Sequence, residues 1–268
     1  MRFYVMGGGC YGTFYARQLL RARAAGALAV DEVVVVDHGE APQAARELGR
    51  EAPLRFERSG WDDFLDRRLG EADLRSDDQL VTPPFTPHLA LAWLLRRVRE
   101  ECADVHWTLE PFRRLPGTPF QRQADGGPLL LSHADWVCPV NCIEPERCPK
   151  TRGPRFWDLD RTVRQLAAAL EEGGQRVEQL HLFHCHHLAY GVGAYPLAEV
   201  ATARAAVTEA VRRAAGGDRW LRFLVGTISH CHGALHLLTA DTGMVSVSAG
   251  SLLPARNPRS QPEASSRA

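Results

Sequence analysis

The chain has almost no lysine, no excess of charge of either sign and no long apolar run. Its 268 residues include a single lysine, Lys150, and 32 basic side chains are balanced by 32 acidic ones. This balance argues against a protein that binds nucleic acid through bulk positive charge, although a local basic patch is compatible with it. No stretch reaches the roughly 18 uninterrupted apolar residues of a membrane span.

The amino-terminal residues and the cysteines indicate the compartment. Residues 1–6 precede a run of glycines and lack the apolar core of a signal peptide. We therefore expect a cytoplasmic protein with neither a membrane nor a nucleic acid as partner. Seven cysteines, an odd number, argue against a disulfide framework in a reducing compartment and leave metal binding or redox chemistry open.

A glycine-rich turn stands between two apolar segments near the amino terminus. The apolar segments predict two buried strands, and a periodic segment between them predicts a helix. The order strand, glycine turn, helix, strand and acidic residue is the context that a dinucleotide-binding motif requires. The predicted strands are residues 2–6 and 33–36, the helix is residues 13–23, the glycines are Gly7, Gly9 and Gly12 in the pattern G-x-G-x-x-G, and the acidic residue is Asp37.

Each residue of this pattern has a physical role in such a site. Gly7 would allow the tight turn, Gly9 would let a pyrophosphate approach the backbone, and Gly12 would let the helix pack closely on the strand. The free N–H groups at the start of the helix would face the phosphates. Asp37 would accept hydrogen bonds from the adenine ribose, and its charge would repel a 2′-phosphate, which favours NAD over NADP. Asp37 follows Gly12 by 25 residues, beyond the usual ~20, so we expect a longer loop around residues 24–31.

Through these residues, positions 2–37 resemble the NAD(P)-binding Rossmann superfamily. The resemblance implies NAD as a cofactor and a parallel sheet with helices between its strands. Helices and strands are predicted to alternate up to about residue 115, and ligands of such sheets lie at the carboxyl ends of the strands. The loop at residues 82–88 is therefore expected to border the cofactor. A glycine turn that is only structural, or that binds another nucleotide, is the alternative.

The predicted fold class is α/β, a Rossmann-like parallel sheet followed by a second α/β region. The second region carries a cysteine-rich loop and a histidine-rich strand edge, and either stands alone or extends the first sheet. The expected divisions are a dinucleotide-binding domain at residues 1–115, a linker rich in proline and glycine at 116–128, the second region at 129–251 and a disordered tail at 252–268.

Three cysteines lie within eleven residues of a proline-rich loop. Cys138, Cys142 and Cys148 follow the spacing C-x3-C-x5-C, and a proline directly follows the first and the last. A zinc ion or an iron–sulfur cluster needs several thiolates near one point, and a stiff loop supplies them. The spacing matches neither a zinc ribbon nor a bacterial ferredoxin, so it predicts a metal centre without its identity. We favour iron–sulfur because electron transfer suits a nicotinamide site, and reduced cysteines without a ligand are the alternative. The candidate fourth ligands are His133, Asp135 and Cys102.

Two predicted strands, residues 177–183 and 221–228, each run into an H-x-H unit. Alternate residues of a strand point to the same face. If the strands are parallel neighbours, both units meet at the edge where α/β folds place their ligands. Four imidazoles and the two thiols of Cys185 and Cys231 there would form a metal or proton-transfer site, whereas single histidines at strand ends are often ordinary hydrogen-bonded residues. The candidate catalytic residues are His184, His186, His230 and His232.

Together these features favour an NAD-dependent oxidoreductase with a metal or iron–sulfur centre. The cofactors would be NAD and either an iron–sulfur cluster or zinc. The partner would be a small-molecule substrate that the sequence does not identify, and a homodimer is left open. Two other classes fit the same residues: a non-enzymatic redox or nucleotide sensor or metal-handling protein, and a metal-dependent hydrolase or chelatase with a degenerate nucleotide site.

Overall fold

The structure is a computed structural model that describes residues 1–49, 52–70, 72–86, 88–123, 127–139, 141–215, 217 and 219–243. Within these ranges the chain forms six helices and two mixed sheets, so the predicted α/β class is confirmed. The tail predicted at 252–268 lies outside the described residues. The elements are β1 (Arg2–Met6), α1 (Cys10–Ala24), β2 (Glu32–Asp37), α2 (Gln43–Leu48), β3 (Leu54–Arg58), α3 (Trp61–Gly70), β4 (Gln79–Val81), α4 (Leu89–Glu101), β5 (His106–Glu110), β6 (Phe120–Gln123), β7 (Leu129–Ser132), α5 (Leu159–Glu172), β8 (Gln179–His184), β9 (His186–Ala189), β10 (Val192–Pro196), α6 (Leu197–Ala214), β11 (Trp220–Ile228) and β12 (His232–Asp241).

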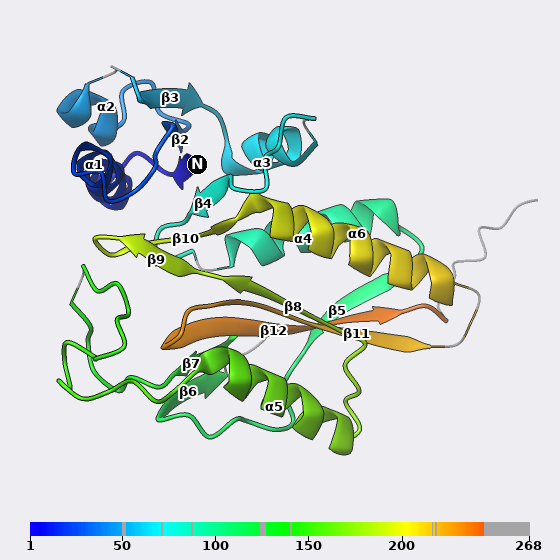
Figure 1. Ribbon diagram of the computed structural model, residues 1–268. Coiled ribbons are helices and arrows are strands. Elements are labelled where there is room, and N and C mark those ends of the chain that lie inside the picture. Colours follow the sequence, from blue (N-terminus) through cyan, green and yellow to red (C-terminus); the bar gives the residue numbers. More distant parts are fainter. Residues whose placement is uncertain are drawn as a thin grey trace, which may run out of the picture.

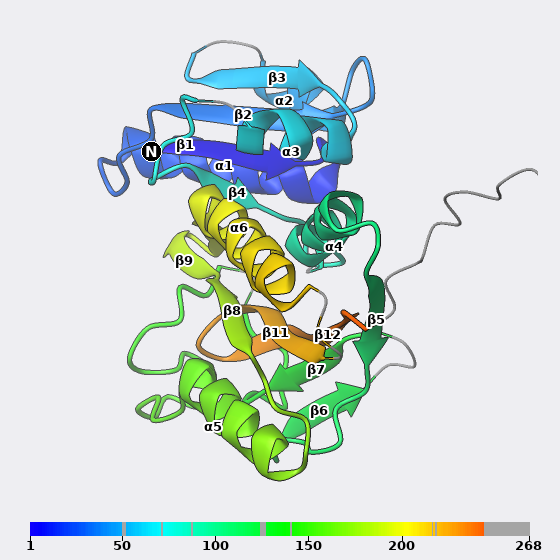
Figure 2. The same cartoon turned by 90° about the vertical axis from the view of Figure 1, so that its right-hand side faces the viewer.

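The first sheet has the strand order β3-β2-β1-β4-β10-β9. Strands β1 to β4 are mutually parallel, and β10 joins β4 in the antiparallel sense. β2 carries four successive valines that are fully buried, because both faces of this sheet are covered. Val33 and Val35 pack toward α1 and α2, whereas Val34 and Val36 pack toward α3, α4 and α6. Figure 2 shows these helices on the two sides of the sheet.

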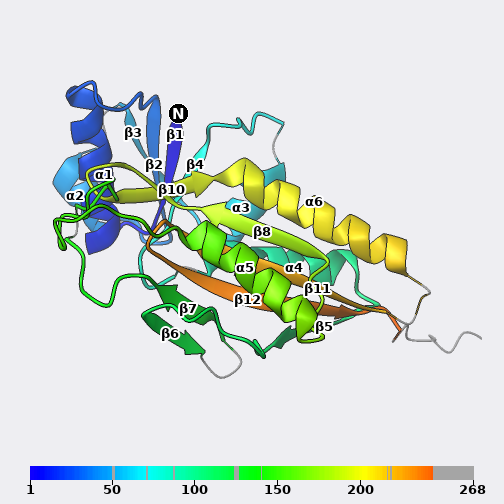
Figure 3. The ribbon, with the colours of Figure 1, turned by 60° about the horizontal axis from the view of Figure 1, so that its bottom comes forward.

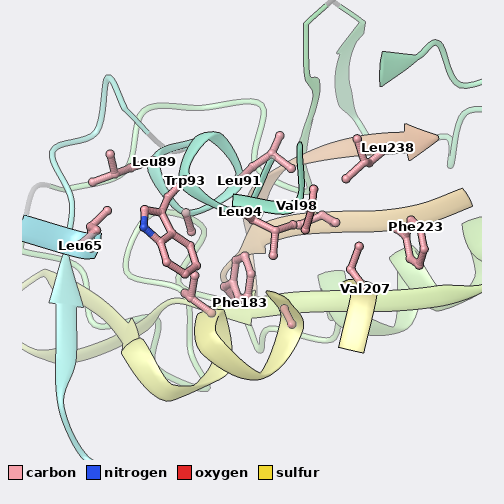
Figure 4. Packing of buried hydrophobic residues seen from close by; sticks show 14 of the residues in the cluster. Leu65, Leu89, Leu91, Trp93, Leu94, Val98, Phe183, Val207, Phe223 and Leu238 are labelled. Atoms are coloured by element: carbon pink, nitrogen blue, oxygen red, sulfur yellow. The ribbon is translucent and has the colours of Figure 1, made fainter. Parts of the chain in front are cut away.

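The second sheet has the order β6-β7-β12-β11-β8, and β5 pairs with the far half of β12. Helix α5 covers one face with a strongly amphipathic surface, and α4 and α6 cover the other. The last two helices therefore lie between the sheets and belong to both cores (Figure 1). Trp93 and Leu94 of α4 pack with Phe183 and Phe223 of the second sheet and with Leu65 of α3, so one continuous core joins the sheets (Figure 4).

The two sheets do not follow the divisions expected from the sequence. Strand β5 lies before residue 115, where the alternating strands were expected to extend the first sheet, but it pairs antiparallel with β12 in the second sheet. Conversely β10, from the predicted second region, pairs with β4 in the first sheet. Residues 116–128, expected as a linker, contain β6. The physical reason is the free edge of β4, whose backbone groups need a partner and find it in the β9–β10 hairpin.

None of the helices in the described ranges combines the length and the apolar character needed to cross a membrane.

Candidate functional site

A cavity of about 610 Å³ lies where the first turn of α1, the start of β9, the β11–β12 turn and the segment of residues 134–155 meet. We call it the thiol cavity because five of the seven cysteines line it. Figures 1 and 3 show that segment, in green, at the same end of the molecule as α1. The cavity brings the glycine-turn helix and the predicted metal loop together. Its titratable lining residues are Cys10, Cys138, Cys142, Glu144, Cys148, Arg155, His187, Cys231 and His232, with Tyr11 and Tyr15.

The cysteine loop is fixed by its own hydrogen bonds, not by helix or strand. The Cys142 N–H donates to the Pro139 carbonyl (3.0 Å), and the Cys148 N–H donates to the Gly153 carbonyl (2.9 Å). The Arg152 N–H returns to the Cys148 carbonyl (2.8 Å), which closes a turn around that cysteine. These bonds hold the loop backbone at Cys142 and Cys148.

The three loop thiols share the cavity but do not converge on a single point. Burial raises the pKa of Cys138, and the neighbouring Cys142 and Cys148 thiols raise it further. Burial also opposes ionisation of Cys148, yet the backbone and hydroxyl of Thr151 and the backbone of Lys150 hold the pKa of that thiol below its ordinary value. In the described ranges, no three His, Cys, Asp or Glu side chains are placed to hold one metal ion. The metal centre thus stays a prediction.

The fourth-ligand candidates from the sequence lie elsewhere. Cys102 ends α4 and is buried in the core that α4 forms with α6. The His133 ring contacts the Thr162 hydroxyl (3.0 Å), and neither His133 nor Asp135 lines the thiol cavity. Instead the cavity walls supply Cys10 and Cys231. Cys231 stands inside the second H-x-H unit, so the sequence groups its thiol with the histidines and not with the cysteine loop.

Cys231 is held firmly at the β11–β12 turn. Its Sγ accepts a hydrogen bond from the Trp157 indole N–H (3.2 Å), and its carbonyl accepts one from the His133 N–H (2.8 Å). Its own N–H donates to the Ser229 hydroxyl (3.3 Å). Burial raises the pKa of the Cys231 thiol to about 12. The nearby Arg155 opposes this shift, but burial outweighs it, so the sulfur is a neutral thiol at physiological pH.

Glu144 connects the cysteine loop to the same turn. Its carboxylate accepts hydrogen bonds from the Ser229 hydroxyl (2.7 Å) and the His230 N–H (3.0 Å). Burial alone would raise the pKa of Glu144, but His187, the Ser229 hydroxyl and His232 together hold it below the ordinary value. Its backbone φ of 49° lies in the left-handed region, which is strained for a glutamate. Sequence reasoning missed this residue, although a glutamate between two cysteines of a rigid loop was visible.

The histidine units meet at one sheet edge but divide between two cavities. β8 and β11 are parallel neighbours with Ile228 opposite His184, as the interpretation of the H-x-H units required. His184, His186 and His230 line a smaller cavity of about 160 Å³ beside Asp158 and Asp160. The His184 ring hydrogen-bonds Asp160 (2.8 Å), and the His184 and His186 ring centroids are 6.2 Å apart.

His232 instead faces the thiol cavity together with His187, which follows the first H-x-H unit and was not predicted as a site residue. Their ring centroids are 6.4 Å apart. The expectation that His230 and His232 project together is wrong. Residues 229–232 form the turn of the β11–β12 hairpin, closed by the Ser229 N–H and the His232 carbonyl (2.8 Å), so the alternation of a strand does not apply. His187 Nδ1 is buried and finds no hydrogen-bond partner among the described residues.

The three glycines of the turn differ in their backbone conformation and in the space around them. Gly7 has a φ of +89°, which favours glycine, and a Cβ at Gly12 would lie 1.7 Å from the Gly7 carbonyl oxygen. At Gly9, the residue before α1, an added Cβ meets no atom within 4 Å. Asp37 accepts hydrogen bonds from the Gly8 N–H (2.6 Å) and the Gly39 N–H (2.7 Å), so its carboxylate also braces the turn.

A second cavity, of about 670 Å³, lies beyond the carboxyl ends of β2, β3 and β4. We call it the nucleotide-side cavity. It adjoins the glycine turn through Trp61, which lies 3.2 Å from the place of a Gly7 Cβ. It approaches the thiol cavity where the rings of Tyr11 and Phe85 meet at 5.9 Å. The expected 82–88 loop contributes to both cavities, and the lining of the second is His38, Gly60, Trp61, Asp62, Phe85, Thr86, His88, Leu89 and Ala92.

Comparison with known proteins identifies one family. Residues 90–241 match the AF_1314_C family model, described as "Uncharacterized protein, C-terminal domain". No curated protein and no solved structure matches the chain. The matched region covers more than half of the chain and includes the cysteine loop and both H-x-H units, but not the glycine turn. The chain belongs to the AF_1314_C family.

Proposed function

We propose that the chain is an NAD-dependent oxidoreductase of the cytoplasm with a metal centre at Cys138, Cys142 and Cys148. The observation that carries this proposal is the lining of the thiol cavity. One wall is the first turn of α1, directly after the glycine turn, and another is the loop that bears the three thiols. A dinucleotide on the glycine turn would therefore extend into the space that the thiols line. The volume is that of a small-molecule site.

The order of the parallel strands supports a Rossmann-type half sheet. β3-β2-β1-β4 matches the first four strands of the order 3-2-1-4-5-6, and the glycine turn lies at the carboxyl end of β1. The open space at Gly9 suits a pyrophosphate close to the backbone. The Asp37 oxygens already accept two N–H bonds, but each carboxylate oxygen has a further lone pair for a ribose hydroxyl. Its negative charge favours NAD over NADP.

The nucleotide-side cavity suits the adenosine half of NAD. It lies at the carboxyl ends of the parallel strands, on the Asp37 side of the glycine turn. Trp61 and Phe85 offer apolar ring faces for an adenine. The nicotinamide half would then enter the thiol cavity past Tyr11, where the two cavities approach each other. This arrangement brings the reactive end of the cofactor close to the thiols.

We favour an iron–sulfur cluster over a single zinc ion because electron transfer would suit a nicotinamide site. Five cysteines line the thiol cavity and would be its candidate ligands. In the described ranges no three donors are placed around one ion, so the thiols would have to move together to hold either centre. When bound, such a cluster would accept and release single electrons. The protein would position the thiols and exclude solvent around them.

Proton transfer would fall to the histidines. His232 and His187 line the thiol cavity, where a bound substrate would meet their rings. An imidazole can both donate and accept a proton near neutral pH. His184, His186 and His230 lie outside this cavity, and we propose that they exchange protons with solvent beside Asp160 rather than contact the substrate.

Anaerobic purification followed by three measurements tests the proposal: iron, sulfide and zinc content, NAD binding by calorimetry, and NADH oxidation with an artificial dye as acceptor. We expect a coloured protein that binds NAD and reduces the dye. NAD binding without any turnover would favour a sensor instead. Metal content without NAD binding would favour a metal-handling protein or a hydrolase. A colourless protein with about one zinc per chain, as in a closed structural site, would replace the cluster by zinc.

A further inference from the structure

We infer that a further cavity, between the two sheets, binds an aliphatic chain of the substrate. It has a volume of about 370 Å³ and lies beside the thiol cavity. We call it the inter-sheet cavity. This inference rests on the proposed function, because it names the substrate class of the same site: an uncharged molecule with an aliphatic chain and one polar end.

The floor of the inter-sheet cavity is a face of the second sheet. Phe223, Val225 and Thr227 alternate along β11 and so share a face, and α4 and α6 cover the first two. Around Thr227 the opposite wall comes instead from the first sheet, from residues 82–84 and the β9–β10 hairpin. Two rows of directly paired residues across the strands form the floor: Thr227, Ala234 and Leu130, and His232, Ser132 and Phe120.

The floor is long enough for a chain. It runs from β11 across β12 and β7 to β6, and each strand is hydrogen-bonded to the next. Neighbouring strands lie about 4.8 Å apart, so the floor spans roughly 14 Å. An extended alkyl chain that lies across the strands therefore suits this cavity.

The lining of the inter-sheet cavity offers no charge. No Asp, Glu, Lys or Arg side chain among the described residues lines it. Burial raises the pKa of Tyr15 and that of Cys185 to about 12, so both are neutral near pH 7. The Ser132 hydroxyl donates to the Ala134 carbonyl (2.7 Å), and the Ser229 hydroxyl donates to a carboxylate (2.7 Å). An ion here would lose its hydration without gaining a partner of opposite charge, whereas an alkyl chain gains from burial.

The inter-sheet cavity and the thiol cavity share a wall. The residues that line both are Tyr15, Pro84, His187, Gly191 and His232. A chain in the inter-sheet cavity would therefore place its polar end at His187 and His232, the imidazoles of the proposed proton transfer. A hydroxyl or carbonyl group at that end can hydrogen-bond an imidazole without bringing a charge. The substrate class is thus an aliphatic alcohol or aldehyde.

Calorimetric titration of the full chain with 1-hexanol, 1-heptanol and 1-octanol, in the absence of NAD, tests this inference. Each methylene group that leaves water for an apolar site strengthens binding roughly fourfold. We expect the affinity of the parent to rise by about that factor with each added carbon. Affinities that do not depend on chain length, or no binding, would overturn the inference.

Filling the cavity locates the site. Ala234→Leu adds bulk to the floor, and Ala205→Leu, at an exposed position of α6, is the matched control. We expect Ala234→Leu to weaken 1-octanol binding at least about tenfold, through the lost burial of the chain, and Ala205→Leu to match the parent. Leu130→Trp fills the same floor at a partly buried position and decides the matter if Ala234→Leu does not fold. Parental affinity in a folded filling variant would overturn the inference.

The outcomes separate this inference from the proposed function. Chain-length-dependent binding by a parent that does not bind NAD would support the apolar site and refute the oxidoreductase. NAD binding without any binding of the alcohols would overturn this inference alone. Sedimentation checks the other occupant that an apolar face can have, a second copy of the chain. A parental dimer that Ala234→Leu converts to a monomer would overturn the assignment to a substrate.

Discussion

Replacing Gly9 by valine separates dinucleotide binding from folding more cleanly than any other change in the glycine turn. Gly9 has an extended backbone (φ −76°, ψ −158°) that any residue can adopt. A Cβ there meets no protein atom within 4 Å, so a valine side chain projects into open space. If a pyrophosphate occupies that space, the valine excludes it. We expect the fold of the Gly9→Val variant to be unchanged.

The expected magnitudes differ sharply between Gly9 and Gly12. Valine is a poorer residue than glycine before a helix, by about 1 kcal/mol, and the stiffer unfolded chain offsets roughly 0.4–1 kcal/mol. The melting temperature of Gly9→Val should therefore stay within about 4 °C of the parent. Gly12→Ala places its Cβ 1.7 Å from the Gly7 carbonyl oxygen, which forces α1 away from β1. Such overpacking costs about 3 kcal/mol or more, or at least about 6 °C.

Calorimetric titration with NAD and NADP measures the affinity of the parent and of Gly9→Val for each dinucleotide. Each charge-assisted hydrogen bond lost from the pyrophosphate is worth about 1.5–3 kcal/mol, or roughly 10- to 150-fold in affinity. We expect Gly9→Val to weaken NAD binding by at least that much while circular dichroism and melting match the parent. Equal affinity in the variant, or no binding by the parent, would refute the dinucleotide site. A parent that prefers NADP would refute only the role of Asp37.

Three further predictions concern polar and titratable side chains. Asp78 is fully buried and binds Arg2 (2.6 and 2.7 Å) and Arg68 (3.0 Å). The substitution Asp78→Ala should lower the free energy of unfolding in urea by about 3–5 kcal/mol. The control Asp31→Ala, at an exposed ion pair, should lower it by no more than about 1 kcal/mol, and equal effects would contradict the buried network. Burial, with His88 nearby, lowers the pKa of His236 to about 4, so the unfolded chain binds a proton that the folded chain does not between pH 6.5 and 4. The free energy of unfolding should fall across that window as pH falls, by on the order of 3 kcal/mol from this group, and His236→Leu should flatten the slope. His187→Ala and His232→Ala should lower NADH-dependent dye reduction about 100-fold, whereas the exposed His106→Ala should match the parent; parental rates in both would remove the histidines from the reaction.

Local pattern was enough for most elements but not for their arrangement. The apolar runs at residues 2–6, 33–36 and 221–228 are visible in the sequence, and the structure contains β1, β2 and β11 where they predict strands. Strand pairing across the chain was not visible. β5 looks the same in sequence whether it extends the first sheet or joins β12, because its apolar pattern fits either neighbour. The choice depends on the edge that β10 covers, which is more than eighty residues away.

The site was predictable in its parts and not in its assembly. The cysteine loop, the glycine turn and the H-x-H units stand out by residue type and spacing. That Cys10, His187 and Cys231 share a cavity with the loop depends on contacts between distant segments. The division of His230 from His232 depends on a turn of four residues that the pattern presented as the continuation of a strand. Tertiary contacts, not spacing, decide which of these side chains meet.

The two sheets explain why these features meet in one place. Ligands of α/β sheets gather at the carboxyl ends of parallel strands, and this chain has two such edges, one after β1 and one after β8 and β11. Helices α4 and α6 hold the sheets with both edges at the same end of the molecule, and the cysteine loop closes the space between them (Figure 3). The AF_1314_C match includes the second edge and the loop but not the glycine turn. Membership of the family therefore bears on the thiol side of the site, and the proposed dinucleotide binding rests on the geometry of Gly9, Gly12 and Asp37.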